Sequence, residues 1–163
     1  MKFIILSFFL VITSGCSSTK TSPESKHQSV KNTVYTFRLK PGDDIKKSLL
    51  QFSRDHSLKA ASIISAAGSL TKVSVRFADQ KNTSELKGPF EIVSLSGTLS
   101  ENDCHLHIAV SDRKGQTFGG HLTEGSEIYT TLEVTLIEQN DLEFFREIDQ
   151  QTTFKELNIR KRN

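Results

Sequence analysis

The sequence predicts a single compact α+β domain, built from a mainly antiparallel or mixed β-sheet with one main helix and a short C-terminal helical turn. Alternation of apolar and polar residues recurs along many short segments, whereas only one segment has a clear helical period. The chain has 163 residues, with 36% hydrophobic and 25% charged, the composition of one globular core and too short for two. No repeat of fixed period occurs.

The domain is expected to begin with a strand and the one clear helix. Residues 33–40 alternate in hydrophobicity, and the Pro-Gly pair after them ends the strand. Asp43 is expected to cap a helix whose apolar residues recur at intervals of four and three, with Asp44 near its positive end. This helix should end near His56 or Ser57.

Most of the remaining chain reads as strands. A small apolar run at 60–67 should end in a turn at Gly68, and a polar loop is expected at 79–88. Residues 142–148 fit neither period, and 154–159 are expected to form the closing helical turn. The other predicted strands cover 73–77, 90–99, 104–111, 117–123 and 128–138.

The first 15 residues have the layout of a secretory signal peptide. Lys2 is the only charge, and the apolar run that follows is too short to span a membrane. Thr13–Cys16 resembles the lipobox of bacterial lipoproteins, which implies cleavage before Cys16 and acyl chains on its sulfur. Ser17 after it favours the periplasmic side of the outer membrane over the inner membrane. An ordinary secreted protein is the alternative.

Residues 16–32 are expected to be a flexible tether, and residues 33–163 the folded domain. Only one aliphatic residue occurs between 17 and 32, too little to offset the entropy of ordering. The whole chain has 21 basic and 19 acidic residues, so its charge predicts no nucleic-acid surface. Once Cys16 is modified, Cys104 is the only thiol, which excludes an internal disulfide.

Four motifs in order resemble the PPC (plants and prokaryotes conserved) domain: Leu39–Asp44, Ala66–Leu70, Gly88–Gly97, and His105–His107 with Gly119–Leu122. The resemblance implies an α+β domain that assembles as a homotrimer. In land plants the domain accompanies an AT-hook that contacts DNA, and this chain has no such hook. It also has Pro89 where plant members usually have Arg.

Three histidines are candidate metal ligands. His105 and His107 are two apart in a predicted strand and so share one face, with Cys104 on the other. A three-residue loop at 112–114 would set His121 opposite His105, and all three rings would converge. A two-residue loop would put His121 on the wrong face, unless the two glycines before it form a bulge.

Three neutral imidazoles suit Zn²⁺ and leave a fourth position for water or a partner's group. The family resemblance also implies metal at these positions in some prokaryotic members. The alternative is a hydrogen-bonded histidine cluster without metal. Glu91 and Glu133 lie in apolar strands, where they either hydrogen-bond to neighbouring backbone or to Arg76, or orient a metal-bound imidazole.

Three functions follow from these features. The first is a membrane-tethered trimeric module that binds a metal or a small ligand through its histidines. The second is a metal-dependent hydrolase in which Glu91 or Glu133 is the base. The third, DNA binding by family analogy, is disfavoured by export and the absent hook. An enzyme is the weaker expectation, because no catalytic triad or phosphate loop is visible.

Overall fold

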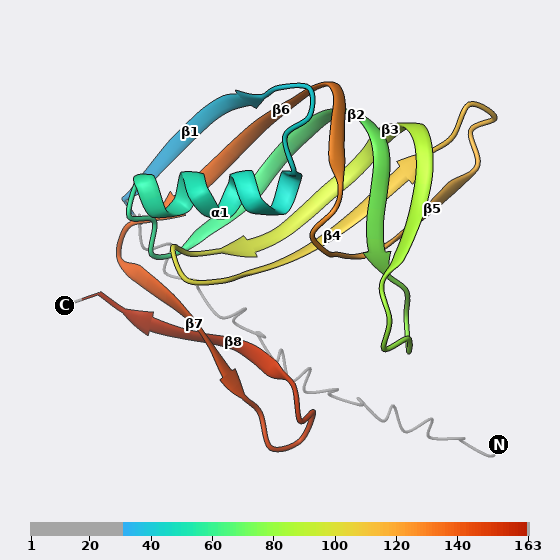
Figure 1. Cartoon of the computed structure of the whole chain (residues 1–163). Coiled ribbons are helices and arrows are strands. Elements are labelled where there is room, and N and C mark those ends of the chain that lie inside the picture. Colours follow the sequence, from blue (N-terminus) through green and yellow to red (C-terminus); the bar gives the residue numbers. More distant parts are fainter. Residues whose placement is uncertain (1–30, 163) are drawn as a thin grey trace, which may run out of the picture.

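The computed structural model describes residues 31–162 as an antiparallel sheet with one helix on it and a separate two-stranded hairpin (Figure 1). Every strand pairing among these residues is antiparallel. The sequence predicted an α+β domain with one main helix and either a mainly antiparallel or a mixed sheet, and the sheet is antiparallel. The elements are β1 (Asn32–Leu39), α1 (Ile45–Asp55), β2 (Ala61–Arg76), β3 (Ser84–Leu99), β4 (Cys104–Ser111), β5 (Thr117–Leu122), β6 (Glu127–Gln139), β7 (Leu142–Ile148) and β8 (Lys155–Lys161).

The predicted signal peptide, Cys16 and most of the predicted tether lie outside the described residues. Within residues 31–162, no helix is long and apolar enough to cross a membrane.

The main sheet has six strands in the order β1-β6-β2-β3-β4-β5. Strand β2 is 16 residues long, and its final residues also pair with β5 through Val75↔Leu122 and Arg76↔His121. Strands β2, β3, β4 and β5 therefore close on one another at one end of the sheet. This closure places the end of β2 beside the strand that carries His121.

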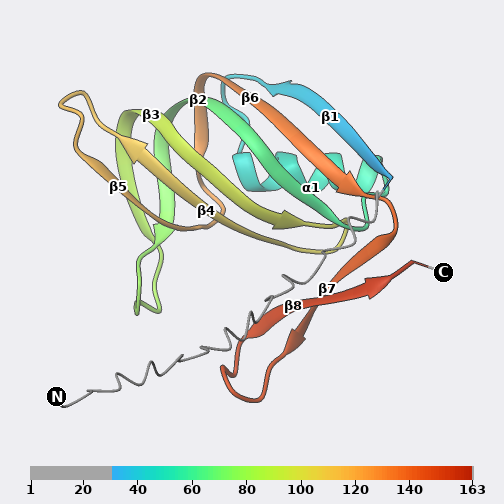
Figure 2. The same ribbon diagram turned by 180° about the vertical axis from the view of Figure 1, so that it is seen from behind.

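The hydrophobic core lies between α1 and one face of the sheet. Ile45 and Leu49 of the helix are fully buried, and they belong to the same core cluster as Leu106 of β4 and Leu136 of β6. Burying each such side chain contributes roughly 1.5–3 kcal/mol. Figure 2 shows the opposite face, with α1 behind the strands and no described helix in front of them.

The N-terminal cap of α1 is Asp44, so the expectation that Asp43 caps the helix was wrong. An Asp44 carboxylate oxygen accepts a hydrogen bond from the backbone N–H of Lys47 at 2.9 Å, which is the cap geometry. Asp43 instead accepts from the backbone N–H of Lys40 and closes the preceding turn. The helix ends at Asp55, next to the predicted end.

Gly68 lies inside β2, so the expected turn there was also wrong. A Cβ at this position would lie 2.1 Å from the backbone oxygen of Thr131 on β6. The glycine is needed because the two strands approach closely, and β2 continues through it. Strand β3 likewise begins at Ser84, so the polar loop after β2 is shorter than expected.

The C-terminal residues form a β-hairpin. Residues 142–148, which fit neither period, are β7, and the segment expected to be a helical turn is β8. The two strands pair from Leu142↔Lys161 to Ile148↔Lys155. The prediction of a helical turn was wrong because pairing with β7, which the local sequence does not reveal, makes this segment a strand.

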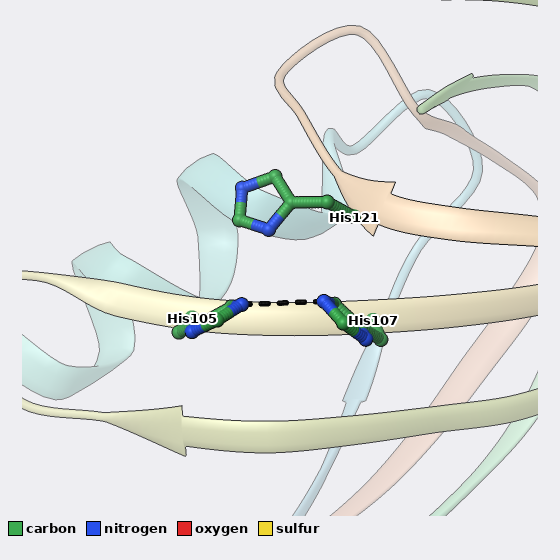
Figure 3. A group of neighbouring side chains, drawn as sticks. All are labelled: His105, His107 and His121. Atoms are coloured by element: carbon green, nitrogen blue, oxygen red, sulfur yellow. Dashed lines mark hydrogen bonds between the residues drawn. The ribbon is translucent and has the colours of Figure 1, made fainter. Parts of the chain in front are cut away.

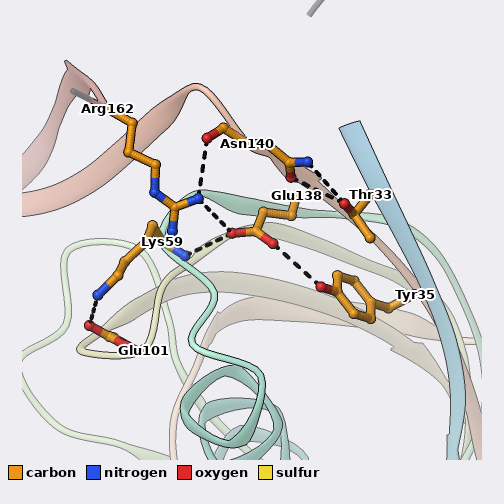
Figure 4. A network of polar contacts seen from close by, with 7 residues as sticks. All are labelled: Thr33, Tyr35, Lys59, Glu101, Glu138, Asn140 and Arg162. Atoms are coloured by element: carbon orange, nitrogen blue, oxygen red, sulfur yellow. Dashed lines mark hydrogen bonds and ion pairs between the residues drawn. The ribbon is translucent and has the colours of Figure 1, made fainter. Parts of the chain in front are cut away.

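A buried carboxylate fixes the end of this hairpin to the main sheet (Figure 4). Glu138 is 6% exposed and accepts from the hydroxyl of Tyr35 at 3.5 Å and the backbone N–H of Lys59 at 3.2 Å. The Arg162 guanidinium lies 3.7 Å from the same carboxylate and also donates to the carbonyl of Asn140. These partners offset the cost of burying the charge.

Candidate metal centre

The three predicted histidines lie together on the sheet face opposite α1 (Figure 3). His107 and His121 are directly paired across β4 and β5, so both project to the same side. His105 is two residues earlier on β4 and shares that side. One ring nitrogen from each lies within 4.8 Å of the other two, which confirms the predicted convergence.

The register that brings them together is not the expected one. The β4–β5 loop spans five residues, 112–116, and an Asp112 carboxylate oxygen accepts from the backbone N–H groups of Lys114 and Gln116. His121 therefore faces His107 and not His105. The shift from the predicted pairing is two residues, and an even shift keeps every side chain on its face.

The two glycines before His121 allow close approach of strands and do not form a bulge. Pairing between β4 and β5 is regular from His107↔His121 to Ser111↔Thr117. A Cβ at Gly119 would lie only 2.2 Å from the backbone oxygen of Ile108. The close spacing of β4 and β5, which carry the histidines, thus depends on Gly119 having no side chain.

Distances between the rings fit a metal site. The Nε2 atoms of His105 and His107 are 3.2 Å apart and form a hydrogen bond (dashed line in Figure 3). Two nitrogens bound to tetrahedral zinc are separated by a similar distance, about 3.3 Å, from Zn–N bonds of about 2.05 Å. Ring centroids are separated by 5.0, 5.0 and 5.7 Å. The buried Nδ1 of His121 has no hydrogen-bond partner among the described residues.

The surroundings favour neutral imidazoles, the form that binds metals. Burial, followed by the charge of Arg146, lowers the pKa of His105. Burial also lowers the pKa of His121 to about 4, with further contributions from His105 and Arg76. Both rings therefore carry a free lone pair at neutral pH.

The other residues weighed from the sequence point away from this cluster or lie apart from it. Cys104 points to the core, and burial raises the pKa of its thiol. Glu91 is exposed and faces Ser111, four residues beyond His107 on β4. Glu133 is exposed and paired with Arg38 on β1. Neither carboxylate is in an apolar environment, and their orienting of a metal-bound imidazole stays a prediction that these positions do not favour.

A hollow of about 630 Å³ lies in front of the histidines. Its walls include four cationic side chains that the sequence did not connect with the histidines: Lys46, Arg76, Arg146 and Lys155. Two of them come from the β7–β8 hairpin. No sequence signal pointed to them, because the hairpin itself was not predicted.

The protein is thus a small α+β domain with an antiparallel sheet, one covering helix and, on the open face, three histidines arranged as metal ligands would be. The chain belongs to the Plants and Prokaryotes Conserved (PCC) domain family, whose model matches residues 26–140. This confirms the resemblance of the four motifs to that family. The β7–β8 hairpin lies beyond the matched residues.

Three comparisons place the chain among its relatives. It is 44% identical over 128 residues to the bifunctional protein GlmU of a Synechococcus strain, matching 78% of this chain and 21% of that protein. It thus spans about a fifth of that relative's length. A hypothetical protein from Salmonella has a similar structure, with a TM-score of 0.81, 39% identity and coverage of 84% of this chain and 99% of that one.

The third is a metal-containing protein from Archaeoglobus fulgidus. Its structure matches with a TM-score of 0.70 and 28% identity, over 80% of this chain and 95% of that one.

Proposed function

We propose that the protein is a metal-binding module in which His105, His107 and His121 hold a divalent transition-metal ion, with Zn²⁺ the preferred ion. The observation that carries this proposal is the convergence of three imidazole nitrogens within 4.8 Å of one another. Neutral imidazoles at this spacing suit zinc. The metal-containing relative from Archaeoglobus fulgidus supports the same reading.

Three protein ligands leave one coordination position open to an external group. The hydrolase alternative would need a base close to that position. Glu91 and Glu133, the bases considered for it, do not line the hollow. The two glutamates considered as bases are therefore not placed for hydrolysis, and ligand binding is the function we propose.

The test is metal content of the purified full-length chain by inductively coupled plasma mass spectrometry. We expect close to one zinc per chain, and close to none in His121→Ala with an unchanged far-UV circular dichroism spectrum. His56→Ala is the matched control, since its exposed ring caps α1 far along the chain from the cluster. Full zinc content in His121→Ala would remove this histidine from the site.

We propose further that the module is a homotrimer, as the family resemblance implies. Exposed apolar side chains on the strands support a partner surface, among them Val34, Ile64, Val93 and Tyr129, each more than half exposed. Gel filtration with light scattering should give three chains per particle. A monomer at micromolar concentration would contradict this assembly.

The lipid anchor on Cys16 completes the proposed function, with the domain on the periplasmic side of the outer membrane. Its support is the signal-like N-terminus and the lipobox-like residues before Cys16. Radiolabelled palmitate should enter the wild type and not Cys16→Ser. Labelling that survives the substitution would refute the anchor.

A further inference from the structure

The hollow in front of the histidines has an excess of positive charge. Its four cations come from four elements: Lys46 from α1, Arg76 from β2, Arg146 from β7 and Lys155 from β8. None of them forms an ion pair with a carboxylate anywhere in residues 31–162. Unpaired cations gathered from distant parts of the chain repel one another unless an anion joins them.

Three carboxylates also line the hollow, and two of them accept hydrogen bonds from residues close to them in the sequence. Asp103 accepts from the backbone N–H of Cys104 at 2.7 Å, and Glu156 accepts from the hydroxyl of Thr152 at 3.0 Å. Asp79 is the third. Four cations against three anions leave a charge of +1, and a divalent ion on neutral histidines would raise it to +3.

The two guanidinium groups flank the histidines from opposite sides. Arg76 is paired with His121 across β2 and β5, so its side chain leaves the sheet on the same face as that ring. Arg146 donates to the hydroxyl of Thr98, which is the β3 residue paired with His105. That bond uses one of five N–H donors, and the rest of the planar fork is available for an oxyanion.

We propose that this hollow binds a small oxyanion, a carboxylate or a phosphate, which occupies the open position on the metal and pairs with Arg146 and Arg76. The proposal rests on the metal site proposed above and names the class of its ligand. A guanidinium fork matches the two oxygens of a carboxylate or phosphate, and such charge-assisted pairs are strong in a recessed site. The hairpin, which lies outside the family match, would then supply the group that selects the ligand.

The test uses the full-length chain loaded with Co²⁺, whose visible absorption spectrum reports on its fourth ligand. Acetate and inorganic phosphate are titrated separately, so that the two oxyanion types are distinguished. We expect at least one of them to change the spectrum saturably. In Arg146→Gln and in Arg76→Gln the dissociation constant should rise about ten- to a hundred-fold, with cobalt still bound at one per chain.

Arg160→Gln is the matched control, because this hairpin arginine pairs with Glu147 and does not line the hollow. Its oxyanion affinity should equal that of the wild type. A chain that binds no cobalt would refute the metal site and the oxyanion proposal with it. Cobalt binding with no response to either oxyanion, or equal affinities in all three arginine variants, would refute the oxyanion site alone.

Discussion

Substituting Gly119 by alanine should weaken metal binding without touching a histidine. The new Cβ would lie 2.2 Å from the backbone oxygen of Ile108, and side-chain carbons keep at least 3.0 Å from such atoms, so β4 and β5 must separate by about 0.8 Å. Ile108 is next to His107, and Gly119 is two residues from His121. The rings would move apart by several times the roughly 0.2 Å that metal–ligand distances tolerate.

We expect the zinc dissociation constant of Gly119→Ala to rise at least tenfold, the lower end of what is lost when ligand positions are disturbed, which is about 10–100-fold. The crowding should cost about 1–3 kcal/mol, leaving a typical domain folded. Competition with a chromophoric chelator measures the affinity, and circular dichroism checks the fold.

Gly115→Ala is the matched control, on the turn of the same hairpin. No atom lies within 4 Å of a Cβ there, although its φ of +77° makes alanine strained by about 1–2 kcal/mol. This variant should lose stability and keep wild-type zinc affinity. If Gly119→Ala binds zinc as tightly as the wild type, strand spacing does not position the histidines.

Three other predictions concern titration, burial and reactivity. In the metal-free protein, the pKa of His121 is about 4 in the folded state, below its ordinary 6.5. As the pH falls, the unfolded chain therefore takes up a proton at this residue before the folded chain does, which favours unfolding. In urea denaturation, the contribution of His121 to the free energy of unfolding should be fully present above about pH 6.5 and should be lost as the pH falls towards 4. His121→Ala should show a smaller fall, and an equal one would contradict the assignment. Glu138→Ala should lower the free energy of unfolding by about 1–3 kcal/mol, because Tyr35 and the Lys59 N–H lose an acceptor, and Glu138→Gln should lose less. Cys104, buried with a raised pKa, should react with a disulfide reagent far more slowly in the native protein than in urea; equal rates would show that the thiol is accessible.

The face shared by His105 and His107 was predictable because it depends only on their spacing along one strand, whereas the face of His121 depended on the loop and stayed open. Strand β4 has the bounds that its alternation predicts, and residues two apart share a face in any strand. The pairing partner of His121 was not predictable, since it depends on loop length. Asp112 closes a five-residue loop through its side chain, a contact that hydrophobic pattern does not reveal.

Gly68 and the C-terminal residues show that the local sequence pattern does not always determine the backbone conformation. Gly68 fits a turn or a close approach equally well from sequence, and only the position of Thr131 on a strand far along the chain decides for the second. Residues 154–159 have no clear period of their own, and pairing with β7 makes them a strand. Arg146 was missed for the same reason, because nothing near it in sequence indicates the histidines.

The position of the β7–β8 hairpin separates two tasks along the chain. The histidines sit on strands of the family domain, whereas half of the cations around the hollow belong to a C-terminal segment held at its base by Arg162. Replacing that segment would therefore change the charge around the hollow and leave the strands that carry the three histidines intact.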